Sequence, residues 1–446
     1  MSIISKDRDN NTIEWMKTLF NTYEDGLNGE KSLSAFKFRK ENFELLKESG
    51  FPTRKDEDWK YTNVTPIITP NYHFGKAADV NQEEVDACLY EGLDTFKLVF
   101  VNGVLNEAHS DLPQLNGLTF LHIDEAMEDE AMRSSITSLQ AQVGGTDKNT
   151  FIQINKTFSH SGYYIEVDKN TQIDKPIQFI YLNKANDSAH FTNPQIFVKA
   201  NTSSEITIIE SHHATADTAE YFTNALSYFH VGQNANVHHY RLQFESGAAY
   251  QINNAIIAQD RDSVYSNYAV DLGGKTVRNN MSTELKGPNT NTNYYGAYIG
   301  MEKQHIDNQT FIDHAVPHCE SNELYKGILS DSAKGVFNGK VLVRQDAQKT
   351  NAFQQNSSLV LSDFASMDAK PQLEIFADDV KCSHGATIGQ LDESSIFYLK
   401  SRGLTDTAAR NILQKAFVGD VVSNFKHEEI KQAIFDKIDK KLERQL

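Results

Sequence analysis

The chain has 446 residues, of which 43 are basic and 60 acidic, giving a formal net charge of −17 at pH 7. Such a charge repels phosphate backbones and anionic membranes, so we expect neither nucleic-acid binding nor membrane association. A hydrophobic fraction of 39% with 10% aromatics is typical of a folded protein. The length exceeds one ordinary globular core and predicts two or three units or an elongated solenoid.

The cysteine content indicates the compartment. Only Cys88, Cys319 and Cys382 occur, and an odd, widely spaced set is typical of free thiols in a reducing environment. The first residues lack the apolar core of a signal peptide, and no apolar run reaches the length of a membrane span. We therefore expect a cytoplasmic protein.

Residues 1–95 form the first predicted unit, which is helical. Residues 34–49 have the apolar spacing of a helix, Gly50 suits its end, and Pro52 prevents continuation. The sequence FPTRKDEDWKYTNV, residues 51–64, is charged and turn-like.

Residues 96–390 form the second predicted unit, which is rich in β-strands. Short β-branched and aromatic runs recur between turn residues: FKLVFV, TFIQIN, YYIEV, IQFIYL, EITIIE, YFHV, VHHYRLQF and QLEIF. Closely spaced strands with no intervening helical pattern predict a sandwich, a barrel or a β-solenoid, and the length of the region favours the solenoid. The asparagines expected at its left-handed corners are Asn234, Asn236, Asn253, Asn254, Asn279 and Asn280.

Residues 391–446 form the third predicted unit, which is again helical. A first helix covers residues 392–402, and Thr405 or Asp406 caps a second one. The apolar stripe of the second helix consists of Ala408, Ala409, Ile412, Leu413, Ala416 and Phe417. Exposed end turns of a solenoid would template aggregation, so we expect helical caps at both ends.

Motifs of common enzymes are missing or incomplete. Gly273, Gly274, Lys275 and Thr276 resemble the end of a phosphate-binding loop, but Ala269 occupies the position of its first glycine and strands flank the motif. Neither a GxSxG nor an HExxH sequence occurs. We therefore expect that the chain does not bind ATP itself.

Histidines provide candidates for a metal site. The pairs His212–His213 and His238–His239 cannot chelate as units, because neighbouring strand residues point to opposite faces. The sequence HAVPHC, with His314, His318 and Cys319, offers three ligands, but Pro317 prevents a helix that would align them. Loop packing is the simpler interpretation of that segment.

Cys382 and His384 form the strongest candidate site. Residues two apart on an extended chain share a face, so the thiol and the imidazole project together. Both groups bind iron or zinc, and Asp378 and Asp379 would attract cations. Because two ligands do not close a site, a partner would have to complete it. On chemistry alone, a buried cysteine beside a hydrogen-bonded histidine remains the simpler alternative.

Three segments resemble the SufB/SufD family of iron–sulfur cluster assembly proteins. They are FPTRKDEDWKYTNV (51–64), ELYKGILSDSAKGVFNGKVLVRQDAQKTNAFQQNSSLVLS (323–362) and FADDVKCSHGATIGQLDESSIFYLKSRGL (376–404), one in each predicted unit. Chains of the SufB branch typically carry CEHEA-like residues where this chain has CSHGA. The resemblance therefore favours the SufD branch, with a SufB-type paralogue as the alternative.

The resemblance implies a right-handed parallel β-helix with helical ends and a scaffold function without catalysis. In the family, SufD pairs with SufB and the ATPase SufC docks on the pair, on which clusters are built and passed to apoproteins. Sulfur arrives from a cysteine desulfurase and its transfer partner. We then expect no tightly bound cofactor in the isolated chain, a nascent cluster shared with SufB, and ATP bound only through SufC. Homodimerisation of the isolated chain is left open.

The resemblance also assigns roles to residues. His384 matches a histidine at the SufB–SufD interface that is implicated in holding the nascent cluster, and Cys382 matches a cysteine whose role is less certain. The helices after Leu391 match the region that docks SufC. We expect Ile412, Leu413 and Phe417 to form the centre of that surface, the alternative being that they pack on the β-helix.

Two functions of other classes compete with the scaffold. A polysaccharide-active β-helix enzyme needs carboxylates clustered in a groove, and the acidic residues are not concentrated in the strand segments. A metal-storage protein is suggested only by the acidity and the histidines.

Overall fold

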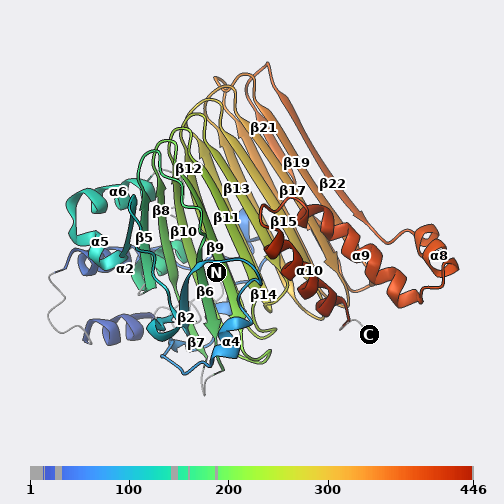
Figure 1. Ribbon diagram of the computed structural model, residues 1–446, viewed down its shortest axis with the longest axis horizontal. Helices are drawn as coiled ribbons and strands as arrows, with labels where there is room; N and C mark the ends of the chain where they lie inside the picture. The colour runs from blue at the N-terminus through green and yellow to red at the C-terminus, as the bar shows by residue number, and fades with distance from the viewer. Residues whose placement is uncertain are drawn as a thin grey trace.

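The computed structural model describes residues 14, 16–25, 33–141, 149–158, 161–185 and 189–443. Its centre is a β-solenoid of about 8 turns, in which the chain passes alternately through two sheets that face each other. Figure 1 shows the long strands stacked side by side, with the N-terminal helices at one end and the C-terminal helices beside the last turns. The expected solenoid is confirmed, and the sandwich and the barrel are excluded.

The twelve-stranded sheet is called sheet A here. Its main path is β20 (Ser366–Ala369), β18 (Lys334–Val343), β16 (His305–His314), β14 (Thr276–Leu285), β12 (Tyr250–Gln259), β10 (Tyr221–Val231), β8 (Pro194–Ala200), β5 (Ser161–Val167) and β4 (Leu118–His122). Off this path lie β1 (His73–Phe74), β7 (His190–Thr192) and β21 (Gln372–Ile375).

The ten-stranded sheet is called sheet B. Its order is β22 (Lys381–Gly389), β19 (Asn351–Val360), β17 (Glu320–Leu329), β15 (Asn291–Gly300), β13 (Val264–Asp271), β11 (Asn236–Phe244), β9 (Glu205–Ala214), β6 (Ile177–Asn183), β2 (Phe96–Val101) and β3 (Val104–Leu105). From β8 to β18 every strand pairs in parallel with the strand two places further along the chain, as in Asn291 opposite Glu320 and Glu320 opposite Asn351.

One corner of the solenoid is built from a stacked series of left-handed residues. Each lies two residues before a strand of sheet B and has a positive φ angle: Ser203, Asn234, Asp262, Asn289, His318 and Lys349. Asn234 confirms the expected corner role. The prediction was wrong for Asn236, which begins β11, and for Asn253, Asn254, Asn279 and Asn280, which lie within β12 and β14. Their side chains form hydrogen bonds within and between turns, for example from Asn280 Nδ2 to Asn254 Oδ1 at 3.2 Å.

The interior changes character along the axis. In the first turns the inward side chains of β2 and β6 are apolar, namely Leu98, Phe100, Ile177, Phe179 and Tyr181. In the later turns three of the inward residues of β19 are polar, namely Gln354, Asn356 and Ser358, and all three are buried. Burial of apolar surface therefore contributes most at the N-terminal end.

The N-terminal region contains α2 (Ser34–Ser49), α3 (Thr65–Ile68), α4 (Gln82–Asp86), α5 (Ile123–Glu128), α6 (Glu130–Ala141) and α7 (Thr150–Phe158), with 3₁₀ turns at Glu57–Trp59 and Glu107–His109. The helix at 34–49 is confirmed, and Gly50 follows it with φ 66°. Helices α5 to α7 interrupt the region that was predicted to be free of helices, and TFIQIN belongs to α7 rather than to a strand. The β-branched residues of this segment favoured a strand in the local pattern, whereas α7 is a helix in which all nine residues are buried, the polar ones included.

The C-terminal helices are α8 (Glu393–Ser401), α9 (Asp406–Val422) and α10 (Glu428–Glu443). Asp392 caps α8, and Thr405 caps α9 through a hydrogen bond from the Ala408 amide. The expected cap over the last turn is wrong. Helices α9 and α10 pack on the outer face of sheet B and bury Tyr240, Tyr268 and Ile299. They lie beside β22 and leave it exposed (Figure 1). As a division into folding units, the ranges 1–95, 96–390 and 391–446 stay a prediction.

Candidate functional site

Strand β22 is the last strand of sheet B, and only one of its edges is paired. It runs parallel to β19 with Cys382 opposite Ala352 and His384 opposite Gln354. All of its residues are exposed except Cys382, which is half-buried. A nine-residue edge with free backbone N–H and C=O groups is a template for a further strand.

Apolar side chains accumulate around this edge. Ile388 of β22 is 55% exposed, Phe376 just before the strand is 64% exposed, and Phe364 is 82% exposed. Several large apolar side chains exposed in the last turn of a fold are typical of a surface that binds another protein. The edge therefore combines unpaired backbone groups with apolar contact area.

Cys382 and His384 both lie on the inward face of β22, above the open interior of the solenoid. The structure thus brings together the two residues that the spacing predicted to share a face. The thiol is half-buried next to Ala352, and burial raises its pKa, so the neutral thiol is favoured. The imidazole of His384 is exposed, and no hydrogen bond to it is present among the described residues. It is free to accept a ligand.

A polar group that the sequence did not single out lies directly below His384. Gln354 Nε2 donates a hydrogen bond to Glu323 Oε1 at 2.9 Å, and Thr310 Oγ1 donates to Glu323 Oε2 at 2.5 Å. Burial raises the pKa of Glu323 to about 7. Positions 323, 354 and 384 could have been found only by knowing the register of three turns, which local patterns do not contain.

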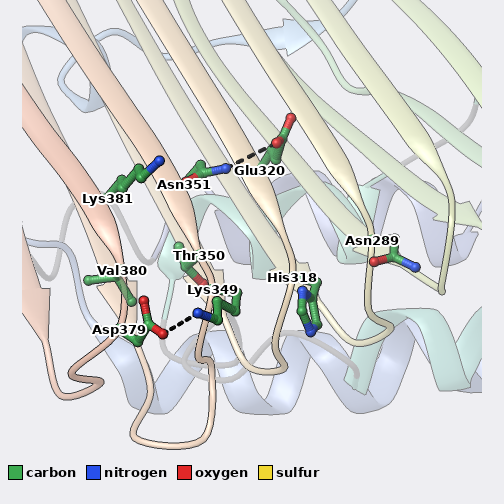
Figure 2. A pocket seen from close by; sticks show the side chains of 9 residues that line it. All are labelled: Asn289, His318, Glu320, Lys349, Thr350, Asn351, Asp379, Val380 and Lys381. Carbon is green, nitrogen blue, oxygen red and sulfur yellow. Dashed lines mark hydrogen bonds and ion pairs between the residues drawn. The ribbon is translucent and has the colours of Figure 1, made fainter.

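A polar pocket lies at the corner that leads into β22. Figure 2 shows it, a cavity of about 450 Å³ that is lined by Asn289, His318, Glu320, Lys349, Thr350, Asn351, Asp379, Val380 and Lys381. Lys349 pairs with Asp379, and Asn351 Nδ2 donates to Glu320 Oε1 at 3.1 Å. Asp379 is therefore paired with a lysine. Of the two aspartates that were expected to attract cations, only Asp378 keeps its charge uncompensated by this pair.

The other candidate metal ligands are separated. His314 is buried in the interior, where its Nε2 lies 2.9 Å from Ser321 Oγ, and burial lowers its pKa to about 4. His318 lies at a corner, and Cys319 is buried in the core. No group of three or more His, Cys, Asp or Glu side chains suited to a metal occurs within the described part of the chain.

The pair His238–His239 and the glycine pair have structural roles. His239 Nε2 lies 2.7 Å from Glu210 Oε1 inside the solenoid, whereas His238 faces outward and lies 3.2 Å from Tyr268 Oη through its Nδ1. Gly273 and Gly274 form the turn between β13 and β14, and a strand follows them instead of a helix. Gly274 has φ 78°, a backbone conformation that glycine adopts easily, so the turn explains this glycine and no phosphate-binding role is needed.

The predicted stripe of α9 is divided between two environments. Phe417 packs against the outer face of sheet B, with the Lys326 Nζ 4.8 Å from its ring centre. Leu413 is half-buried and Ile412 is 45% exposed. Phe397 and Tyr398 of α8 are 74% and 55% exposed, which extends the apolar surface beyond α9. None of the helices in the described ranges is long and apolar enough to cross a membrane.

Two family models match the chain. The model of the SufBD core domain of the SUF iron–sulfur cluster assembly system matches residues 181–417, and that of the SufBD N-terminal region matches residues 10–179. The chain therefore belongs to the SufBD family of iron–sulfur cluster assembly proteins.

Three relatives narrow this assignment. The chain is 30% identical over 406 residues to the iron–sulfur cluster assembly protein SufD of Escherichia coli, covering 90% of this chain and 92% of the relative. It is 28% identical to SufD of Bacillus subtilis, with 87% and 89% covered, and 32% identical to the SufBD family protein slr0076 of Synechocystis, with 85% of each covered. The chain is accordingly a SufD-type assembly protein of the SUF system.

Proposed function

We propose that the chain is the non-catalytic scaffold subunit that pairs with SufB, and that the unpaired edge of β22 is the surface through which it does so. The observation that carries this proposal is the free edge itself, which presents Cys382 and His384 on one face beside exposed apolar side chains. A strand added to this edge would satisfy the unpaired backbone groups and bury Ile388 and Phe376.

The cargo of this surface is a nascent iron–sulfur cluster held between the two subunits. A neutral imidazole is a suitable iron ligand, so His384 supplies one ligand and SufB supplies others. Cys382 contributes through packing, because its half-buried thiol has a raised pKa. The isolated chain holds no tightly bound cofactor, and sulfur is delivered by a cysteine desulfurase and its transfer partner.

The exposed part of the C-terminal helices is the surface that SufC occupies. Ile412, Leu413 and the α8 aromatics Phe397 and Tyr398 offer apolar area that the solenoid does not bury, whereas Phe417 holds α9 in place. ATP is bound and hydrolysed by SufC alone. The complex acts in the cytoplasm, on proteins rather than on nucleic acids or membranes.

The role of His384 is tested by His384→Ala in the purified complex with SufB and SufC. One interface imidazole contributes about 1–3 kcal/mol, so the complex should still elute intact. Iron and acid-labile sulfide per complex should collapse, because alanine offers no ligand. Cys382→Ser is the matched variant on the same strand and should retain most of the cluster. A His384→Ala complex with full cluster content makes His384 a structural residue.

The SufC surface is tested by Ile412→Asp. The side chain is 45% exposed, so the free energy of unfolding should change by less than about 0.5 kcal/mol while SufC binding is lost. The control is Phe417→Ala, which should destabilise the chain, since the ring packs on sheet B. Circular dichroism and a binding assay with SufC report both quantities. Undiminished binding by a folded Ile412→Asp chain would refute this surface.

A further inference from the structure

Three inward-facing residues in consecutive turns form a column that ends at His384. Glu323 of β17 is opposite Gln354 of β19, and Gln354 is opposite His384 of β22. Neighbouring strands lie about 4.8 Å apart, so each side chain lies next to the following one. Glu323 and Gln354 are buried, and only His384 reaches solvent.

The carboxylate of Glu323 fixes the orientation of the Gln354 amide. An ionised carboxylate only accepts hydrogen bonds, and Glu323 accepts one from Thr310 and one from Gln354. Above the pKa of Glu323, which is about 7, the carboxylate is ionised and Gln354 must direct its NH₂ group to it. The orientation follows from the chemistry of the carboxylate and does not depend on distinguishing oxygen from nitrogen.

The other end of the amide is an acceptor without a donor. Gln354 Oε1 is buried, and no described group donates a hydrogen bond to it. The facing strand confines the amide, because a Cβ atom at Gly339 would lie 2.3 Å from Gln354 Nε2 and 2.8 Å from its Cδ. A buried acceptor of this kind requires a donor. In the column, the residue next to Gln354 on the open side is His384.

We propose that Gln354, held by Glu323, accepts a hydrogen bond from one ring N–H of His384 and so positions the imidazole at the open end. The other ring nitrogen then keeps its lone pair and faces outward, toward the partner and the iron. The proposal rests on the function proposed for His384 and assigns Gln354 and Glu323 as positioning residues. Outer groups of this kind fix the tautomer and the ring orientation of histidine ligands in metal sites.

The tautomer of His384 tests the proposal directly. The full-length chain is labelled with ¹⁵N-histidine, and the His384 signals are assigned by their loss in His384→Ala. At pH 8.5 a free imidazole is neutral and Glu323, whose pKa is about 7, is ionised. We expect one tautomer in the wild type. Gln354→Leu removes the acceptor and Glu323→Gln frees the amide to rotate, so both should give the two-tautomer mixture of an exposed imidazole.

Asn356→Leu is the matched control. Asn356 lies on the same strand and the same inward face, is buried, and also has a side-chain oxygen without a donor, but it is opposite Ala386. Its substitution should leave the His384 signals unchanged. Unshifted signals of the buried His239 verify the fold of each variant. If Gln354→Leu does not fold, Glu323→Gln alone tests the proposal, because it conserves the side-chain volume.

The proposal is overturned if either Gln354→Leu or Glu323→Gln retains the single tautomer of the wild type, or if Asn356→Leu changes it equally. The effect on metal should follow, with the affinity of the SufB complex for ferrous iron about 10–100-fold lower in both variants. The two proposals fail separately. If the His384→Ala complex keeps its cluster, the ligand role of His384 is refuted, and the tautomer result is unaffected. If His384→Ala loses the cluster but Gln354→Leu and Glu323→Gln keep the single tautomer, only the positioning role of Gln354 and Glu323 is refuted.

Discussion

The two ends of the solenoid are built in opposite ways. At the N-terminal end, antiparallel strands β3 and β4 flank the first turns, the interior is apolar, and helices α2 and α5 to α7 cover the outside. At the C-terminal end, β22 has a free edge, and polar side chains of β19 enter the interior beside a small apolar cluster around Val341 and Val343. The C-terminal helices pack on the outer face of sheet B and do not cover the last turn. The difference indicates that apolar burial in the first turns stabilises the fold, whereas the last turn leaves a strand edge unpaired.

The largest effect on stability should be the difference between two phenylalanine-to-alanine substitutions, one at each end of the solenoid. Phe179→Ala removes a fully buried ring from the apolar interior, where it stacks near Tyr181 and Phe100, and should lower the free energy of unfolding by about 3–5 kcal/mol. Phe353→Ala, in which the ring is 46% exposed on β19, should change it by less than about 0.5 kcal/mol. Chemical denaturation measures the free energy of unfolding of both variants. Similar losses of stability in the two variants would contradict the difference between the two ends.

A second effect should appear in the pH dependence of stability, through a buried carboxyl group. Burial raises the pKa of Glu245 to about 8, from 4.5 in the unfolded chain. The folded state therefore binds a proton that the unfolded state releases, and this contribution to stability is lost as the pH rises toward and through 8. Glu245→Gln is a neutral isostere and lacks this dependence.

The expected result is a melting temperature of Glu245→Gln that is close to that of the wild type at pH 5 and higher at pH 9. Thermal unfolding of both proteins at pH 5, 7 and 9 measures it, and all other titrating groups cancel in the difference. A difference between the two proteins that is constant from pH 5 to pH 9 would show that Glu245 is already ionised in the fold.

The smallest effect on stability should come from the free edge. Ile388→Lys replaces a side chain that is 55% exposed, so the free energy of unfolding should change by less than about 0.5 kcal/mol. A lysine on an edge strand opposes pairing with another strand. Self-association of the isolated wild-type chain, measured by sedimentation, should therefore decrease in the variant, and equal self-association would exclude β22 as the contact.

The sequence predicted the structure correctly where a local pattern was compatible with only one type of secondary structure. The helix 34–49, the cap at Thr405, most of the strands and the shared face of Cys382 and His384 followed from local patterns alone. It failed at α7, because a helix buried on all sides carries the same β-branched residues as a strand. The uncovered last turn and the column from Glu323 to His384 depend on contacts between residues that are far apart in the sequence, which no local pattern specifies.

The corners of the solenoid have a consequence for how such a chain evolves. The corner between β10 and β11 has four residues, 232–235, whereas that between β18 and β19 has seven, 344–350, and the strands on both sides keep their register. Insertions are thus tolerated at corners. One residue inserted within β22 before Cys382 would move Cys382 and His384 to the other face. Because corner lengths vary while the strands keep their register, the turns differ in length, and this accounts for a sequence in which no strict repeat is visible.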